Sequence, residues 1–246
     1  MSFYRKALAC VCSVWLLASC AGDGPKLADL ADAAGAALRD GDKGALTSSD
    51  ITRGLKEALS TGSNAVVNQL GTANGFNGDP TIRIALPSSL QKARELASKV
   101  GLASSFDDLE LKLNQAAEQA TPKARELFLG AITSMSVEDA TGILKGPDNA
   151  ATEYFRDATG ESLAAQMRPI VDQALAQVGA VSSFNQLLDK YNSIPFAPKV
   201  EADLTGHVVK EGSDGIFYYL AQEEKAIREN PLKRTSELLQ RVFSSQ

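Results

Sequence analysis

The stretch "SSDITRGLKEALSTGSNAVVNQLG", residues 48–71, shows the pattern that decides the fold class of this chain. Its large apolar residues recur every four or seven positions, at Ile51, Leu55, Leu59, Val66 and Leu70. This spacing is close to whole turns of an α-helix, so these side chains share one face. Ser48 or Ser49 can cap the start, and Gly71 can end the helix. We therefore predict an amphipathic helix that packs one face against other helices.

Similar apolar patterns cover most of the remaining chain, each between a start signal such as Ser or Asp and a stop signal such as Gly or Pro. We predict further helices over residues 27–40, 88–101, 104–120, 122–135, 136–146, 149–159, 160–179, 182–191, 214–230 and 232–243. Pro169 should kink the helix that contains it. Short loops and the lack of a fixed-period repeat favour one all-α domain of about ten helices, residues 27–246.

One segment departs from the helical pattern. "TIRIALP" (Thr81–Pro87) alternates in the manner of a short strand that ends at its proline. A strand needs a partner, and Pro198–Leu204 is the best candidate. We therefore expect a minor two-stranded β element. The Pro-rich segment 193–203 is the best internal boundary within the domain.

The N-terminus has the features of an export leader. Arg5 and Lys6 precede an apolar run at residues 7–19. That run is shorter than the roughly 20 residues needed to cross a bilayer, but it suits a secretory signal. The alternative is a short buried helix of a cytosolic fold. It is the weaker interpretation, because the run is apolar on all sides and ends in small residues.

The end of this leader is more specific. "LASC" (residues 17–20) resembles the bacterial lipobox, in which an aliphatic and two small residues precede a cysteine. The resemblance implies cleavage after residue 19 and attachment of lipid to Cys20, with residues 20–26 as a short tether. Two or more acyl chains hold a protein firmly on a membrane. Ala21 in place of aspartate favours the outer membrane, facing the periplasm, over the inner membrane.

Composition excludes several classes of function. The net charge of −5 would become −7 when Arg5 and Lys6 leave with the leader. Such an acidic chain is a poor nucleic-acid binder, because phosphate binding requires excess Lys and Arg. Cys10 and Cys12 would leave as well, so the mature domain would hold no free thiol and no disulfide. With His207 as the only histidine, we expect no metal site and no cofactor.

No nucleotide-binding glycine motif or serine nucleophile motif stands out in the sequence. The remaining chemical candidates are four carboxylates, Glu118, Glu138, Asp139 and Glu153. Helix capping and solvated helix faces explain them more simply than acid–base catalysis does. Ser136 and Asp139, for example, have the spacing of a capping box.

The last part of the chain contains two further features. In "IFYYLA", Phe217, Tyr218 and Tyr219 cannot all point to the same side of a helix. One of these aromatic side chains is therefore a candidate contact for a partner or an apolar ligand, although core packing is the simpler interpretation. The following segment, residues 222–231, is charge-rich, and its pairs Glu224–Arg228 and Lys225–Glu229 suit a solvated helix face.

Several ordered segments together resemble a bacterial lipoprotein family known as domain of unknown function 4197. They are "ITRGLKEAL", "IRIALP", "LNQAAEQA", "MSVEDATGILKGPDNAATEYF", "DGIFYYLAQEEKAIRENP" and "LLQRVF". The resemblance spans about residues 51–243. It implies an exported, mostly helical, membrane-anchored protein, and it brings no reaction and no catalytic residues. His207 stands where the family pattern suggests an aromatic residue.

The leading hypothesis is a non-catalytic periplasmic lipoprotein that binds a partner protein or an apolar ligand such as a lipid. Helices lined by Ala and Leu can leave an apolar cleft between them. The competing hypothesis is a hydrolase that uses the four carboxylates, which requires at least two of them to converge in a pocket.

Overall fold

The structure is a computed structural model that describes residues 47–234 and 236–244. All of them belong to the compact unit Leu46–Gln246. The expected leader, Cys20, the tether and the helix at 27–40 lie outside the described residues. The α-helices are α2 (Ser48–Leu70), α3 (Ser88–Ser98), α4 (Ala103–Ala120), α5 (Ala124–Ser134), α6 (Val137–Lys145), α7 (Ala150–Gln177), α8 (Ala180–Asn192), α9 (Leu204–Glu229) and α10 (Glu237–Ser244). Two 3-10 turns, η1 (Thr121–Lys123) and η2 (Pro231–Lys233), complete the described elements.

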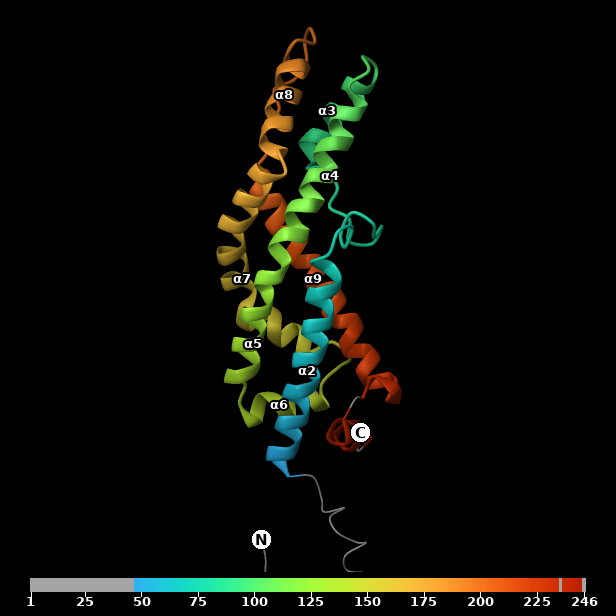
Figure 1. The fold of residues 1–246 in the computed structure, drawn as a ribbon, viewed down its shortest axis with the longest axis vertical. Coiled ribbons are helices and arrows are strands. Elements are labelled where there is room, and N and C mark those ends of the chain that lie inside the picture. The colour runs from blue at the N-terminus through green and yellow to red at the C-terminus, as the bar shows by residue number, and fades with distance from the viewer. Residues whose placement is uncertain (1–46, 235, 245–246) are drawn as a thin grey trace, which may run out of the picture. The chain divides into compact units, whose positions relative to one another are not determined.

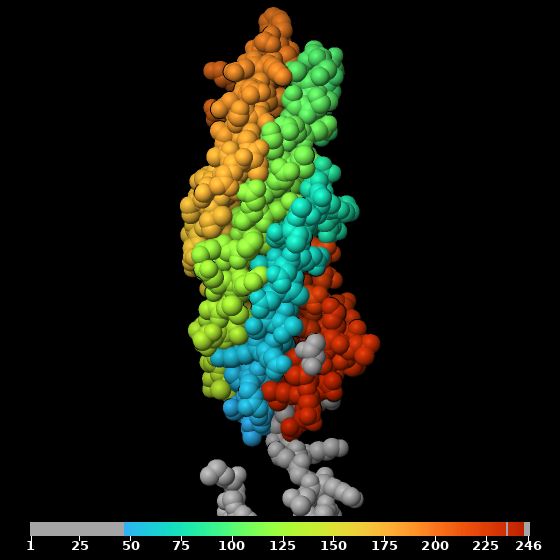
Figure 2. Space-filling model, in the orientation of Figure 1, coloured from blue at the N-terminus to red at the C-terminus, as the bar shows by residue number. Residues whose placement is uncertain are grey.

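The prediction of an all-α fold is confirmed, although the described helices are slightly fewer than the expected ten or so. Helices α2, α4, α7 and α9 run side by side along the unit (Figure 1). Figure 2 shows α2, in blue, packed against the yellow-green α5 on the face that it presents. The unit has its own continuous apolar core, which is the property of a domain that can fold alone.

Two helices begin at capping residues close to those that the sequence indicated. Ser136 and Asp139 form the predicted capping box of α6, with Asp139 N 3.0 Å from Ser136 Oγ. A second capping box begins α2, but its cap is Thr47, one residue before the predicted serines. The helix ends at Gly71, as predicted. Of the apolar face predicted for α2, Leu55, Leu59, Val66 and Leu70 are buried, while Ile51 is half-buried.

The expected β element is wrong. The described residues form no strand, and the backbone of Ile84 pairs with a side chain instead. The buried Asn114 of α4 accepts a hydrogen bond from Ile84 N at 2.8 Å and donates one to Ile84 O at 2.9 Å. One amide side chain thus replaces the neighbouring strand, because it offers one donor and one acceptor in the same plane. Leu204, the end of the proposed partner strand, instead begins α9.

Two helices are longer than predicted. The two helices predicted over residues 149–159 and 160–179 are one continuous helix, α7, with Pro169 inside it. The last long helix begins at Leu204 rather than near residue 214, because the Asp203 carboxylate accepts a hydrogen bond from Gly206 N at 2.8 Å. This is an N-cap that satisfies a backbone donor of the first turn.

The core lies between α2, α4, α5, α7 and α9. One face of α4 is fully buried, at Phe106, Leu109, Leu113 and Ala117. Phe128 of α5 packs its ring against Phe155 of α7 and Phe217 of α9, with ring centroids 5.5 Å and 6.1 Å apart. This aromatic cluster ties three helices together.

Among the described residues, no single helix combines the length and apolarity needed to cross a membrane. One pair of segments, Ala103–Ser134 and Val137–Lys145, is together long and apolar enough for a membrane span, but the chain bends by 105° between them.

Candidate functional site

A surface groove runs between α7 and α9, which lie against each other over much of their length. It has a volume of about 460 Å³, within the roughly 300–1,000 Å³ typical of small-molecule pockets. We call it the α7–α9 groove. The lining residues are Arg156, Gly160, Ala164, Ala165 and Arg168 from α7, and Gly206, Val209, Lys210, Ser213, Asp214 and Phe217 from α9.

The groove exists because the residues along its walls are small. A Cβ atom placed on Gly160 would meet no atom within 4 Å, so the space above this residue is open. Across the groove, a Cβ atom on Gly206 would overlap the Asp203 carboxylate and lie 3.0 Å from Arg168 Nη2. The absence of a side chain at Gly206 therefore lets Asp203 cap α9 and lets Arg168 approach it.

Basic side chains stand at both ends of the groove. At one end, Arg156 Nη1 lies 3.3 Å from Asp214 Oδ1, and Lys210 Nζ lies 3.2 Å from Asp214 Oδ2. Lys210 also pairs with Glu211 at 2.8 Å. At the other end, Arg168 Nη2 lies 3.4 Å from Asp203 Oδ2. Three cations thus line the groove, together with one carboxylate, that of Asp214.

The three candidate aromatic residues point in different directions, as their spacing requires. Phe217 is buried and forms part of the groove, where the Arg156 guanidinium lies 4.6 Å from its ring centroid. Tyr218 is 43% exposed. Tyr219 donates a hydrogen bond to the Asp79 carboxylate, which raises the pKa of Tyr219 to about 12 and lowers the pKa of Asp79. Of the three, only Phe217 lines the groove.

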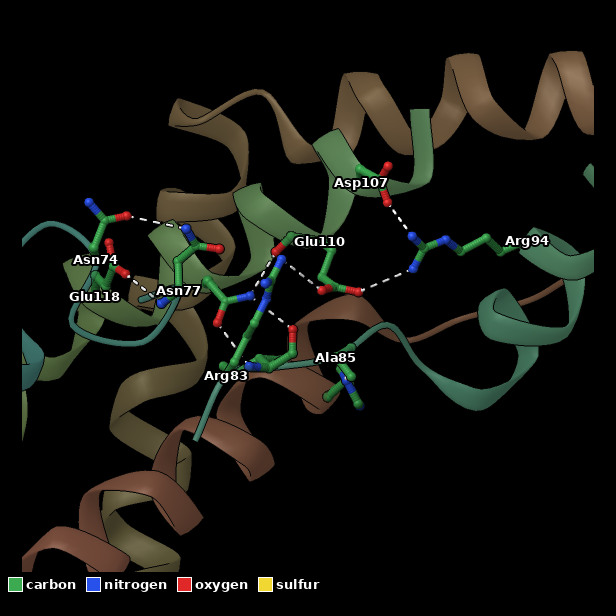
Figure 3. A network of polar contacts seen from close by, with 11 residues as sticks. Asn74, Asn77, Arg83, Ala85, Arg94, Asp107, Glu110 and Glu118 are labelled. Atoms are coloured by element: carbon green, nitrogen blue, oxygen red, sulfur yellow. Dashed lines mark hydrogen bonds and ion pairs between the residues drawn. The ribbon is translucent and has the colours of Figure 1, made fainter. Parts of the chain in front are cut away.

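The four candidate carboxylates have separate structural partners. Glu118 is buried and accepts hydrogen bonds from the backbone N–H groups of Phe76 and Asn77, both at 3.1 Å. Figure 3 shows Glu118 beside Asn77, where α4 supports the turn that follows α2. Glu118 therefore holds a loop in place, and it is not a lining residue of the groove.

The other three carboxylates lie in the first turns of helices. Asp139 closes the capping box of α6, and hydrogen bonds from Ser136 lower its pKa. Glu138 is exposed in the same turn, and the exposed Glu153 lies 3.3 Å from the Asn149 amide. None of the four lines the α7–α9 groove. The structure does not bring them together there.

The extended segment 83–87 is held by polar contacts to α3, α4 and α9. Arg83 and Arg94 both reach Glu110, at 3.1 Å and 3.9 Å, and Arg94 also pairs with Asp107 (Figure 3). His207 Nε2 lies 2.7 Å from the carbonyl oxygen of Ala85, so this nitrogen donates the hydrogen bond. His207 lies in the first turn of α9 and fixes a backbone carbonyl.

The charged pair Glu224–Arg228 was predicted on a solvated face, and this prediction is wrong. Glu224 is only 7% exposed. Its carboxylate accepts hydrogen bonds at 2.9 Å from Ala151 N, Thr152 N and Thr152 Oγ1 at the start of α7. Arg228 pairs with Glu224 at 3.0 Å and donates to Ile143 O at the end of α6. The pair thus joins α9 to the junction of α6 and α7.

Sequence reasoning missed this role because the two partners of Glu224 lie more than 70 residues away in the chain. The N-cap residue of α7 is Asn149, and its side chain makes no capping bond. The Glu224 carboxylate takes the place of a local cap, because it accepts the backbone N–H groups of Ala151 and Thr152 in the first turn. Within the described residues, no group of three or more potential ligands is placed to hold a metal ion.

Of three comparisons with known proteins, one found a match. A search of curated proteins found no match, and neither did a search of solved structures. A family model described as "Protein of unknown function (DUF4197)" matches residues 45–244, which include every described helix. The chain therefore belongs to the DUF4197 family.

Proposed function

We propose that this protein is a membrane-anchored lipoprotein of the cell envelope that binds an amphiphilic ligand in the α7–α9 groove without transforming it. The observation that carries the proposal is the groove itself, an open space of about 460 Å³ with small and apolar residues between charged ends. A ligand with an apolar body and a polar end matches this distribution.

The size of the groove favours a small ligand over a partner protein. A stable protein interface buries about 800 Å² on each partner, which is a broad surface rather than a groove between two helices. Phe217 contributes an apolar wall, which supports its role as a ligand contact. Tyr218 and Tyr219 lie outside the groove and have no part in the proposal.

The lipid anchor in this proposal is inferred from the sequence alone. Cys20 follows the lipobox-like "LAS", and its lipidation would attach the domain to a membrane. Ala21 supports the outer membrane and a periplasm-facing domain. The first described helix, α2, begins at Ser48, so 27 residues separate it from Cys20.

The non-catalytic part of the proposal is supported by the candidate carboxylates. Glu118 and Asp139 accept hydrogen bonds from backbone N–H groups. Both carboxylates therefore already have structural roles, in a loop and a helix start. No observation favours a hydrolase over a binding protein, so binding stands as the single proposal.

The test is recovery of a ligand with the protein. The chain from Ala21 to Gln246, exported behind a cleavable leader without the cysteine, keeps the whole compact unit. Native mass spectrometry and lipid extraction should detect a bound amphiphile. Gly160→Leu should abolish its recovery, because a Cβ atom at Gly160 meets no atom within 4 Å and the rest of the leucine side chain would occupy the groove.

Gly130→Leu is the matched control. Gly130 lies in α5, and a Cβ atom there also meets no atom within 4 Å. This variant should retain the ligand. Recovery of the same amphiphile from wild-type protein and Gly160→Leu would show that it binds elsewhere, and recovery of no amphiphile from any of the three proteins would refute the proposal.

A further inference from the structure

We infer that the ligand of the α7–α9 groove is a single-chain amphiphile with a phosphate headgroup, and that Arg156 and Lys210 bind the phosphate. This inference rests on the proposed function, because it names the chemical class that the same groove takes. It starts from the convergence of two cations, one from each helix, at one end of the groove.

The Arg156 end has two cations that share one lining carboxylate. Arg156 and Lys210 approach the two oxygens of Asp214 at 3.3 Å and 3.2 Å. At the other end, Arg168 has Asp203 as its own partner. At the first end, therefore, two cations from different helices converge on one lining carboxylate, and Lys210 has Glu211, outside the lining, as a second partner at 2.8 Å. An anionic group is the complementary occupant of that end.

The existing ion pairs are easily exchanged for a ligand. The side chains of Arg156, Lys210 and Asp214 are 43%, 68% and 49% exposed. Ion pairs with this exposure are weak, because water screens both charges. Asp214 can turn toward solvent when a phosphate takes its place. A phosphate has enough oxygen acceptors to receive the guanidinium fork of Arg156 and the Lys210 ammonium together.

Arg156 is already held at the groove wall. Its guanidinium lies 4.6 Å from the ring centroid of the buried Phe217, which is cation–π distance. A cation that is ordered before binding loses less conformational entropy when the ligand arrives. Phe217 thus acts as a positioning residue for the headgroup as well as an apolar wall.

The rest of the groove suits one acyl chain. Arg156 and Arg168 are twelve residues apart on α7, or about 18 Å along the helix axis. Between them the α7 wall is formed by Gly160, Ala164 and Ala165, and α9 contributes Val209. These residues expose little except backbone and methyl groups, against which a methylene chain can pack. The groove volume is that of a drug-sized molecule, which favours one chain over two.

Isothermal titration calorimetry on the chain from Ala21 to Gln246 tests the inference with three probes below their micelle concentrations. Lauroyl-lysophosphatidylglycerol should bind. Monolauroylglycerol, which has the same chain without phosphate, should bind at least about tenfold more weakly, since a hydrogen bond to a charged group contributes about 1.5–3 kcal/mol. Glycerophosphate, which lacks the chain, should give no measurable binding, which separates a lipid from a free phosphate ester.

Charge-removing variants locate the headgroup. Arg156→Gln and Lys210→Gln should each weaken lysophosphatidylglycerol binding about tenfold and leave monolauroylglycerol binding unchanged. Lys225→Gln is the matched control, because it removes one positive charge from the same helix outside the groove, where Lys225 is 52% exposed. It should have no effect on either probe.

The outcomes separate this inference from the function on which it rests. Equal affinity for the two lauroyl compounds, lost in Gly160→Leu, would overturn the phosphate assignment and leave amphiphile binding intact. Binding of neither compound would overturn both. Equal losses in Lys210→Gln and Lys225→Gln would show a general charge effect and would also overturn the assignment.

Discussion

Replacing Glu224 by glutamine should destabilise the fold more than any other removal of a single carboxylate charge on α9. The Glu224 carboxylate accepts hydrogen bonds from Ala151 N, Thr152 N and Thr152 Oγ1, and it pairs with Arg228. Glutamine has nearly the same shape, but one of its two oxygens becomes an NH₂ donor. That donor would face N–H groups and a guanidinium, which are donors themselves.

The magnitude follows from burial. The side chains of Glu224 and Arg228 are 6% and 13% exposed, so water screens the pair little. Removing one partner of a buried ion pair costs about 3–5 kcal/mol, because the other charge stays buried without compensation. Arg228 keeps hydrogen bonds to Ile143 O and Leu144 O, which places Glu224→Gln near the lower value, about 3 kcal/mol. For a domain of this size, that corresponds to a fall in Tm of about 6–12 °C.

Urea and thermal unfolding of the chain from Ala21 to Gln246, followed by circular dichroism, measure this loss. Glu229→Gln is the matched control, since Glu229 pairs with Lys225 at 3.8 Å at the same i,i+4 spacing on the same helix. Both of those side chains are more than half exposed, so the control should lose less than about 0.5 kcal/mol. Equal losses in the two variants would refute the structural role of Glu224.

Three further predictions concern other parts of the chain. Tyr219→Phe should remove the tyrosine that ionises last, at a pKa of about 12, from an alkaline absorbance titration. Because the Tyr219 pKa is raised, its contribution to stability is complete below about pH 10 and is lost as the pH rises toward 12. Gly215→Ala should destabilise the protein by about 1–3 kcal/mol, because the new Cβ atom would lie 2.9 Å from Phe76 Cε1. Gly62→Ala should instead stabilise α2 by about 0.5–1 kcal/mol, because the nearest atom to its new Cβ lies at 3.6 Å. Denaturant unfolding measures both changes. The full chain should incorporate labelled palmitate in a bacterial host and Cys20→Ala should not, and label in both would refute lipidation at this cysteine.

Features of the fold that depend on neighbouring residues could be predicted from the sequence. The α6 capping box requires only Ser136 and Asp139, three positions apart, and the buried face of α4 requires only helical spacing. The cap of α2 was missed by one residue because Thr47, Ser48 and Ser49 are all competent caps. Competition between adjacent residues of the same type limits such predictions.

Features that depend on distant residues could not be predicted. The alternation of residues 81–87 does indicate an extended backbone, but its partner is the side chain of Asn114 rather than a second strand. The spacing of Glu224 and Arg228 is the same as that of an exposed pair, and only the approach of α6 and α7 makes the pair buried.

The α7–α9 groove likewise combines one residue that the sequence indicated with others that only the packing of distant helices brings together. Phe217 was a candidate because three consecutive aromatic residues cannot share one helix face, and it does line the groove. Arg156 and Lys210, by contrast, lie 54 positions apart and come together only because α7 and α9 pack against each other. No local sequence signal connects them.

Methyl-region NMR spectra can detect an amphiphile in the α7–α9 groove through the side chains that line it. On addition of lauroyl-lysophosphatidylglycerol to the chain from Ala21 to Gln246, the methyl signals of Ala164, Ala165 and Val209 should shift most. Those of Val66 and Val67, which are buried in α2 away from the groove, should stay in place. Unchanged signals at the three groove residues, with the lipid at saturating concentration, would show that no amphiphile occupies the groove.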